Sequence, residues 1–127
     1  RAWYGSLLDS VSLCLAEVLP IQIAVVFVDA DRIRELNNQY RGVARVTDVL
    51  SFGYTDERGV LREGEIIICP FQALRQRHRF RTTVLQEFAR LFFHGVLHIY
   101  GYDHVNPADR KRMRTLEDCL MTRAGPL

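Results

Sequence analysis

The chain has 127 residues, of which 48% are hydrophobic and 25% are charged, and its formal net charge is +2. This length suits one compact domain with its own core, and the composition excludes disordered, collagen-like and disulfide-stapled proteins. No apolar run approaches the length that spans a bilayer, and nothing at the N-terminus has the pattern of a secretory signal. We therefore expect a single domain over residues 1–127.

The cationic residues are almost all arginine, with Lys111 as the one lysine among 17. The guanidinium fork of arginine suits phosphate groups, although a GC-rich genome would produce the same bias. Cys14, Cys69 and Cys119 are isolated and lie in apolar runs. This pattern predicts reduced cysteines in the core of a cytoplasmic protein, neither bridged nor bound to metal.

The first two predicted elements are a helix and a strand. Apolar residues recur at helical spacing from Leu7 to Val18, and Pro20 ends the pattern. The β-branched run over residues 21–28 predicts a buried strand.

A second helix is predicted to begin after Asp29 or Asp31, either of which can cap it, and to end before Gly42. One face of this helix carries its hydrophobic residues, Ile33, Leu36 and Tyr40. Two further strands are predicted over residues 46–52 and 65–69, separated by a turn-rich stretch from Tyr54 to Gly64. A short helix is expected after Pro70.

The longest predicted helix runs from about Thr82 to Tyr100 and stops at Gly101. A last helix is capped by Asn106, with Pro107 in its first position. Its apolar face consists of Met113, Leu116 and Leu120. Helices mixed with three to four strands predict an α+β domain, a small mixed sheet packed with helices.

The longest helix carries a narrow polar stripe on an otherwise apolar surface. On a helical wheel, Glu87, Arg90 and His98 lie within about 40° of His94. A helix that is apolar nearly all round belongs in the core, where polar groups cost free energy unless a partner satisfies them. We therefore expect this stripe to face a cleft or an ion.

Three of the four histidines fall within one segment of eleven residues, His94 to His104. His94 and His98 are one turn apart, so both rings can reach one ion. Gly101 can reverse the chain and return His104 as a third ligand. Three imidazoles with an open fourth position are typical of catalytic zinc, although nickel, copper and iron also accept such ligands. Each histidine alone could instead be a hydrogen-bonded core residue.

The spacing of these histidines is also that of metzincin proteases, which place a glutamate directly after the first histidine as the general base. Gly95 occupies that position here. A peptidase mechanism therefore lacks one part, whereas hydrolysis in general remains open because zinc alone lowers the pKa of bound water to roughly 7.

The segment His94-Gly95-Val96-Leu97-His98-Ile99-Tyr100-Gly101-Tyr102-Asp103-His104 resembles the motif of the YbeY family of bacterial endoribonucleases. Further matches are Leu36-Asn37 with Tyr40-Arg41, Thr47-Asp48-Val49-Leu50-Ser51-Phe52 and Gly64-Glu65-Ile66-Ile67-Ile68, with weaker matches at Glu87, Met113 and Glu117. Gly53 stands where the family has proline, which we expect to loosen a turn beside the cleft. The strand that precedes the first helix in the family has no counterpart in this sequence, so we expect a sheet that is one strand smaller or has its edge cut away.

The resemblance implies a metal-dependent, single-strand-specific RNase with a metzincin-like zinc helix. It implies action in rRNA maturation, at the 3′ end of small-subunit rRNA, and in ribosome quality control, with the ribosome or its small-subunit proteins as partners. It carries over His94, His98 and His104 as the ligands of one zinc ion per chain, and Arg41 as the active-site arginine. We assign Arg41 and His94 to the catalytic centre.

Arg41 is expected to bind the scissile phosphate of RNA, because its fork can hold two oxygens of a negatively charged phosphorus centre. Its alternative role is that of a cation at the end of a helix. Asp103 either holds a ligand imidazole or caps the turn. Glu87 pairs with an arginine or orders the cleft, and Thr47 and Ser51 line its wall or satisfy a strand edge.

Two other functions compete with the endoribonuclease hypothesis. One is a zinc hydrolase of peptide or small-molecule bonds, with another residue as its base. The other is a non-catalytic factor that binds RNA or the ribosome, which would need a filled fourth zinc position. No further Cys or His is obviously placed to fill it.

Overall fold

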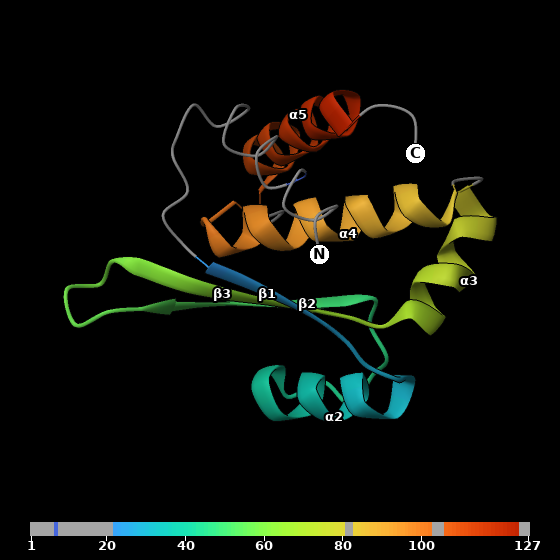
Figure 1. The fold of residues 1–127 in the computed structure, drawn as a ribbon, viewed down its shortest axis with the longest axis horizontal. Coiled ribbons are helices and arrows are strands. Elements are labelled where there is room, and N and C mark those ends of the chain that lie inside the picture. The colour runs from blue at the N-terminus through green and yellow to red at the C-terminus, as the bar shows by residue number, and fades with distance from the viewer. Residues whose placement is uncertain (1–6, 8–21, 81–82, 103–105, 125–127) are drawn as a thin grey trace.

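The computed structural model describes residues 7, 22–80, 83–102 and 106–124. Its helices and strands follow in the order β1 (Gln22–Phe27), α2 (Ala30–Arg41), β2 (Val49–Thr55), β3 (Leu61–Ile68), α3 (Pro70–Phe80), α4 (Val84–Ile99) and α5 (Pro107–Ala124). Figure 1 shows a layered arrangement, in which α2 covers one face of the sheet while α4 and then α5 cover the other. Within the described part of the chain, no helix is long and apolar enough to cross a membrane.

The described sheet has three strands in the order β1-β3-β2. β1 runs parallel to the central strand β3, and β2 runs antiparallel to it. The parallel pair requires a crossover, and this crossover carries α2 on one face of the sheet. The structure therefore confirms the predicted α+β class and its small mixed sheet.

The β2–β3 hairpin is longer than predicted. The stretch from Tyr54 to Gly64 was expected to be turn, yet β2 continues to Thr55 and β3 begins at Leu61. Asp56 closes the short turn by accepting hydrogen bonds from the amides of Arg58 (2.8 Å) and Val60 (3.0 Å). These strand ends could not be predicted from the sequence, because most of their residues are exposed and do not show the alternation of hydrophobic and polar residues that marks a half-buried strand.

The caps of α2 lie where the sequence places them. The Asp29 carboxylate accepts a hydrogen bond from the Arg32 amide at 2.8 Å, and Gly42 ends the helix with φ of 69°. Ile33 and Leu36 are buried, whereas Tyr40 on the same face is 58% exposed. Tyr40 lies in the last turn of the helix, where its ring contacts that of Phe52 with 5.0 Å between centroids.

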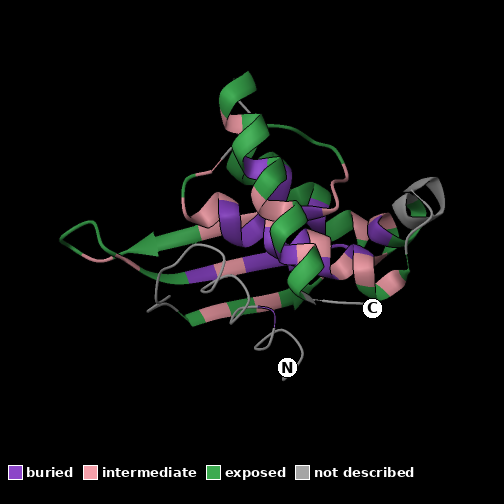
Figure 2. Cartoon of the chain, turned by 90° about the horizontal axis from the view of Figure 1, so that it is seen from above, coloured by how far each residue is buried: buried purple, intermediate pink, exposed green. Residues whose placement is uncertain are grey.

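α4 supplies the centre of the core, as its hydrophobicity predicts. Thr83 caps its start with a reciprocal capping box, and Gly101 follows its end with φ of 93°. Figure 2 shows buried residues along much of this helix where it lies over the sheet. Its fully buried members include Ala89, Leu91, Phe92, Phe93, Val96 and Leu97. Leu85 is an exception, since the first turn leaves it 48% exposed.

α5 begins with the predicted cap, because the Asn106 side chain accepts a hydrogen bond from the Asp109 amide at 2.9 Å. Its expected apolar face packs on α4 through buried Met113 and Leu120, with Leu116 partly buried. Cys69 is buried as predicted, whereas Cys119 is exposed because it lies on the outer side of this helix. Cys14 and the first predicted helix lie outside the described residues, apart from buried Leu7.

Two glycines face each other across the hairpin and receive the end of α4. Gly53 pairs with Gly64 in the β2–β3 register. A Cβ at Gly64 would lie 2.9 Å from the Cδ1 of Ile99, and a Cβ at Gly53 would lie 3.3 Å from its Cγ2. Gly53 is thus a mid-strand residue and the expectation of a loosened turn there is wrong. Because neither glycine has a side chain, the end of α4 can lie close to the sheet.

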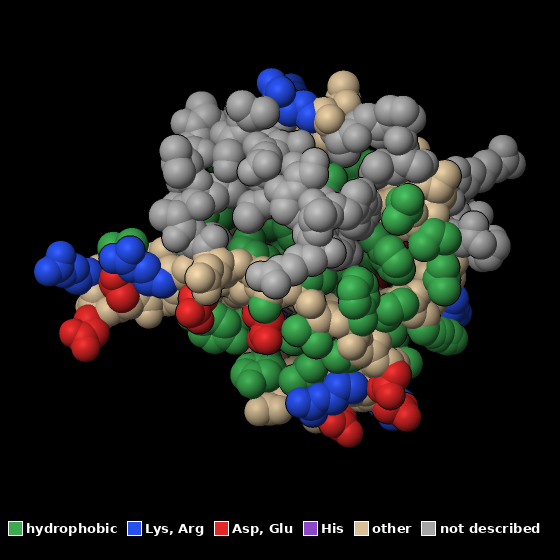
Figure 3. Space-filling view, in the orientation of Figure 1, with side chains coloured by type: hydrophobic (Ala, Val, Ile, Leu, Met, Phe, Trp, Pro, Cys, Tyr) green, Lys and Arg blue, Asp and Glu red, His purple; other side chains and the backbone are tan. Residues whose placement is uncertain are grey.

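Charged side chains gather at the tip of the β2–β3 hairpin and along α2, as Figure 3 shows. The same view shows hydrophobic side chains at the surface beside the charged ones. The exposed large hydrophobic residues of the described chain include Phe27, Phe71, Leu74 and Leu85. The ion pairs on α2, Arg32 with Glu35 and Arg34 with Asp31, join exposed residues and therefore contribute little stability.

Candidate metal centre

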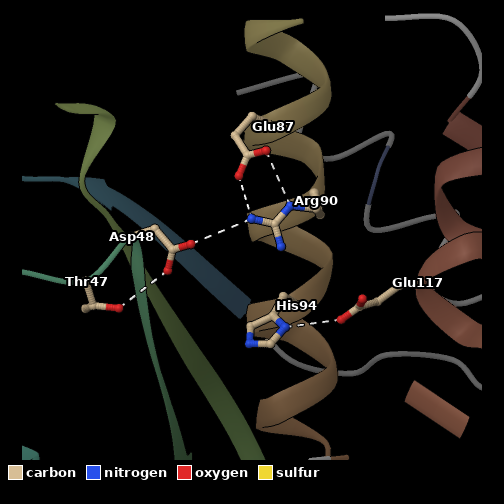
Figure 4. A network of polar contacts seen from close by, with 6 residues as sticks. All are labelled: Thr47, Asp48, Glu87, Arg90, His94 and Glu117. Atoms are coloured by element: carbon tan, nitrogen blue, oxygen red, sulfur yellow. Dashed lines mark hydrogen bonds and ion pairs between the residues drawn. The ribbon is translucent and has the colours of Figure 1, made fainter. Parts of the chain in front are cut away.

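The polar stripe of α4 lies as the wheel predicts, with Glu87, Arg90 and His94 on one side of the helix (Figure 4). The rings of His94 and His98 are 4.7 Å apart between centroids and inclined at 63°. Both histidines are partly buried. Two imidazoles this close on one helix face can hold one metal ion between them.

Glu117 reaches His94 from α5. Its Oε1 lies 3.1 Å from the Nδ1 of His94, and the two side chains are 19% and 24% exposed. A carboxylate at this distance favours the tautomer in which Nδ1 carries the proton and donates it to Glu117. That tautomer places the lone pair of His94 on Nε2, the atom through which the ring would then bind a metal. The donor set therefore fits a transition-metal ion.

Arg90 lies one turn before His94, between two carboxylates from different segments. Its Nη2 is 2.5 Å from Glu87 Oε1 and its Nε is 3.4 Å from Glu87 Oε2. The same Nη2 is 3.6 Å from Oδ2 of Asp48. Burial lowers the pKa of Arg90, but the hydrogen bond and charge of Glu87 and the charge of Asp48 outweigh it and raise the pKa above its ordinary value. The guanidinium is therefore a permanent cation.

The network in Figure 4 has an excess of negative charge. Three carboxylates, Glu87, Asp48 and Glu117, face one guanidinium, which leaves a net charge of −2 when the histidines are neutral. Such a field favours a bound cation over a bound anion near the stripe. It thus agrees with the donor chemistry of the two histidines.

The predicted residues of the cleft wall lie around the start of β2. Thr47 donates a hydrogen bond from Oγ1 to Oδ1 of Asp48 at 3.4 Å, and both side chains are partly buried. Ser51 is partly buried on β2, opposite Ile66 of β3. Glu87 pairs with an arginine, one of the two roles that the sequence left open. It is 1% exposed and stabilises the stripe from within.

Arg41 is not brought to the histidines. It is the last residue of α2, on the opposite face of the sheet from α4, and it is exposed. Its position at the helix C-terminus suits the favourable interaction of a cation with the helix dipole. Its role toward phosphate stays a prediction.

The other two predicted residues, Asp103 and His104, lie outside the described residues. Among the residues that the structure describes, no group of three or more His, Cys, Asp or Glu is arranged to hold a metal. His94 and His98 therefore form the described part of the candidate centre.

Gly95 is directed into the core and away from the histidine stripe. A Cβ at this position would lie 3.2 Å from each of three side-chain carbons of Ile66 on β3. The position that carries the catalytic glutamate in metzincins is thus used here for close packing between helix and sheet. Packing explains why a carboxylate is missing there.

A cavity of about 250 Å³ opens at the C-terminal end of α4. The described residues that line it are Tyr100, Gly101, Tyr102, Asp109 and Arg112. Its volume lies slightly below the range typical of small-molecule pockets. It joins the turn after the histidine helix to the first two turns of α5.

Sequence reasoning did not single out Asp48, Arg90 or Glu117 as site residues. Arg90 was detectable, since it shares the stripe and follows Glu87 at the helical spacing of an ion pair. Asp48 and Glu117 come from other elements, and only tertiary packing brings them to α4. Both lie at positions of the quoted family resemblance, which was the available signal.

Comparisons with known proteins identify the family of this chain. The family model described as Endoribonuclease YbeY matches residues 1–125. An Endoribonuclease YbeY from Thermodesulfovibrio yellowstonii is 41% identical over 107 residues, covering 82% of this chain and 67% of that protein. One from Spiroplasma citri is 35% identical over 122 residues, covering 90% and 77%.

A solved structure is also similar. The solution structure of a target protein from Thermotoga maritima has a TM-score of 0.59 and 28% identity, covering 96% of this chain and 81% of that one. The family match spans nearly the whole sequence, and the relatives named above share more than a third of the aligned residues. The chain belongs to the YbeY endoribonuclease family.

Proposed function

We propose that this protein is a metal-dependent endoribonuclease that cleaves single-stranded RNA. The observation that carries the proposal is the His94–His98 pair on α4, with Glu117 against His94, in a chain matched by the Endoribonuclease YbeY model. Relatives named as endoribonucleases make RNA the substrate class to expect.

The metal is proposed to be zinc, one ion per chain, held by His94, His98 and His104. When bound, it would supply a Lewis acid and a water of lowered pKa. Neutral imidazole ligands and the surrounding negative charge support a divalent transition metal, and nickel, copper or iron would fit the same donors.

The chain's own side chains would then orient the metal ligand His94 and bind the scissile phosphate. Glu117 holds the proton on His94 Nδ1 and so directs Nε2 toward the ligand position. Arg41 is proposed to bind the scissile phosphate through its fork, which would require the RNA or the chain to bridge the two sides of the sheet. Gly95 offers no base, so a protease mechanism of the metzincin kind is disfavoured.

The proposed natural substrate is rRNA, at the 3′ end of the small-subunit RNA, with a further part in ribosome quality control. This assignment rests on the family resemblance and includes a cytoplasmic location with ribosomal partners.

The deciding experiment compares the purified parent with His98→Ala. Each protein is incubated with a single-stranded RNA and with casein, in the presence and absence of a chelator. We expect the parent alone to cleave RNA, and the chelator to abolish that cleavage. Equal cleavage by His98→Ala would identify a contaminating RNase and overturn the proposal.

The other results identify the competing functions. Cleavage of casein would favour a peptide hydrolase, and RNA binding without turnover would favour a non-catalytic factor. Metal analysis on the same pair should give about one zinc per chain in the parent and little in His98→Ala. Arg41→Ala should keep its zinc and lose RNA cleavage, and full cleavage by that variant would refute its role.

A further inference from the structure

Asp48, Glu87 and Arg90 form an ion triad that joins two segments far apart in the sequence, and we call it the Arg90 clamp. We propose that Arg90 is a positioning residue, which fixes the start of β2 against the helix that carries His94 and His98. This inference rests on the proposed function for its effect on RNA cleavage, while the clamp itself can be tested without any activity.

The geometry of the clamp requires an arginine. Arg90 contacts both oxygens of Glu87, through Nη2 at 2.5 Å and Nε at 3.4 Å, and contacts Asp48 with the same Nη2 at 3.6 Å. The planar guanidinium group of an arginine can contact both oxygens of a carboxylate, whereas the ammonium group of a lysine acts as a single point charge. Glu87 is 1% exposed, so its carboxylate depends on Arg90 for charge compensation.

Asp48 is fixed on its other side by the sheet. Its carbonyl accepts a hydrogen bond from the Cys69 amide at the end of β3, at 2.9 Å. Its carboxylate points to Arg90 on α4 (Figure 4). One residue therefore connects the central strand to the helix one turn before His94, at the end of the connection that follows Arg41.

The clamp fixes α4 against the start of β2, and His94 follows Arg90 by one turn on the same helix. The position of the histidine rings toward a bound RNA strand therefore depends on this link. A shift of about 1 Å at a catalytic centre can cost 100-fold in rate, so release of the clamp should lower kcat. RNA affinity comes mainly from phosphate contacts, and KM should change little.

Amide hydrogen exchange tests the clamp directly. In Arg90→Lys we expect faster exchange than in the parent for residues 46–50, because the link from Asp48 to α4 is weakened. The matched control is Arg62→Lys, which alters an exposed ion pair with Asp56 (2.8 Å) on the hairpin. Unchanged exchange at residues 46–50 in Arg90→Lys would overturn the clamp.

A double-mutant cycle tests the positioning role. We expect Arg90→Lys and Asp48→Asn each to lower kcat for a single-stranded RNA about tenfold, with KM and zinc content within twofold of the parent. The double variant should be no more than about twofold worse than either single variant, since both remove one link. Ile33→Val, in the core on the other face of the sheet, controls for lost stability and should keep its kcat.

The outcomes separate this inference from the proposed function. If the parent fails to cleave RNA, the proposed function is wrong and the exchange data alone decide whether the clamp exists. If the parent cleaves RNA but Arg90→Lys keeps its kcat, or if the two single effects multiply in the double variant, the positioning role is refuted.

Discussion

The two halves of the polar stripe on α4 solve the problem of buried polarity in different ways. In the N-terminal half, the guanidinium of Arg90 is compensated by the carboxylates of Glu87 and Asp48. In the C-terminal half, the rings of His94 and His98 lie 4.7 Å apart, with Glu117 against the first. The N-terminal half therefore pairs permanent charges of opposite sign, whereas the C-terminal half carries imidazoles that can be neutral.

The two halves therefore differ in what they can do: one can hold segments of the chain together, and the other can bind a metal. A guanidinium is always protonated and cannot bind a metal, so the N-terminal half can only hold segments together. A neutral imidazole keeps a lone pair and can become a ligand. We therefore expect substitutions in the N-terminal half to act on stability and on the position of the histidines, and those in the C-terminal half to act mainly on metal binding.

The largest effect is expected from Gly95→Glu, which introduces a carboxylate at the position directly after His94. The new side chain would meet Ile66 in the core and bury a charge, at a cost of about 4 kcal/mol in the free energy of unfolding. Thermal unfolding followed by circular dichroism measures the loss. A folded Gly95→Glu that cleaves casein would show that position 95 belongs to the site.

Arg90→Ala should be the next most damaging change. It leaves the carboxylate of Glu87 buried and uncompensated, at about 2 kcal/mol after allowing for the 36% exposure of the Arg90 side chain. His98→Ala should cost less than about 1 kcal/mol in the apo protein, because that half is built for a ligand. Denaturant unfolding of both variants in the absence of metal measures these two losses of stability. Equal losses in the two variants would contradict the expected difference between the halves.

Glu117→Gln should have a smaller effect, confined to the C-terminal half. The amide no longer holds the proton on His94 Nδ1 as a carboxylate does, so zinc affinity should fall about tenfold. Competition against a fluorescent zinc chelator measures this change. Zinc affinity equal to that of the parent would show that Glu117 does not orient His94.

The smallest expected effect concerns an exposed carboxylate, which contrasts with buried Glu87. A hydrogen bond from the backbone amide of Val60 and one from the side chain of Arg62 lower the pKa of Asp56. A carboxyl whose folded pKa lies below its unfolded value near 3.9 contributes stability above that pH and loses it as the pH falls through the folded pKa. Asp56→Asn should therefore reduce stability slightly at pH 7 and scarcely at pH 2, as measured by urea unfolding.

The sequence was most informative where local rules decide the structure. The helical wheel located the stripe of α4, and cap residues such as Asp29 and Asn106 located helix ends, because both depend on neighbours within one turn. The hairpin ends were missed because exposed strands lack a hydrophobic period. Asp48 and Glu117 reach the stripe only through long-range packing, which no local pattern encodes.

Gly53 and Gly64 face each other on the hairpin, and their lack of side chains determines how close α4, which carries the histidines, lies to the sheet. Ile99, the neighbour of His98, lies against the space that a Cβ at either glycine would take, and Leu61 Cδ1 would lie 2.8 Å from a Cβ at Gly53. The side chains of Ile99 and Leu61 therefore fill the volume that larger residues at positions 53 and 64 would need. A larger residue at either glycine would lift α4 away from the sheet, and the histidines with it, unless one of these two side chains became smaller.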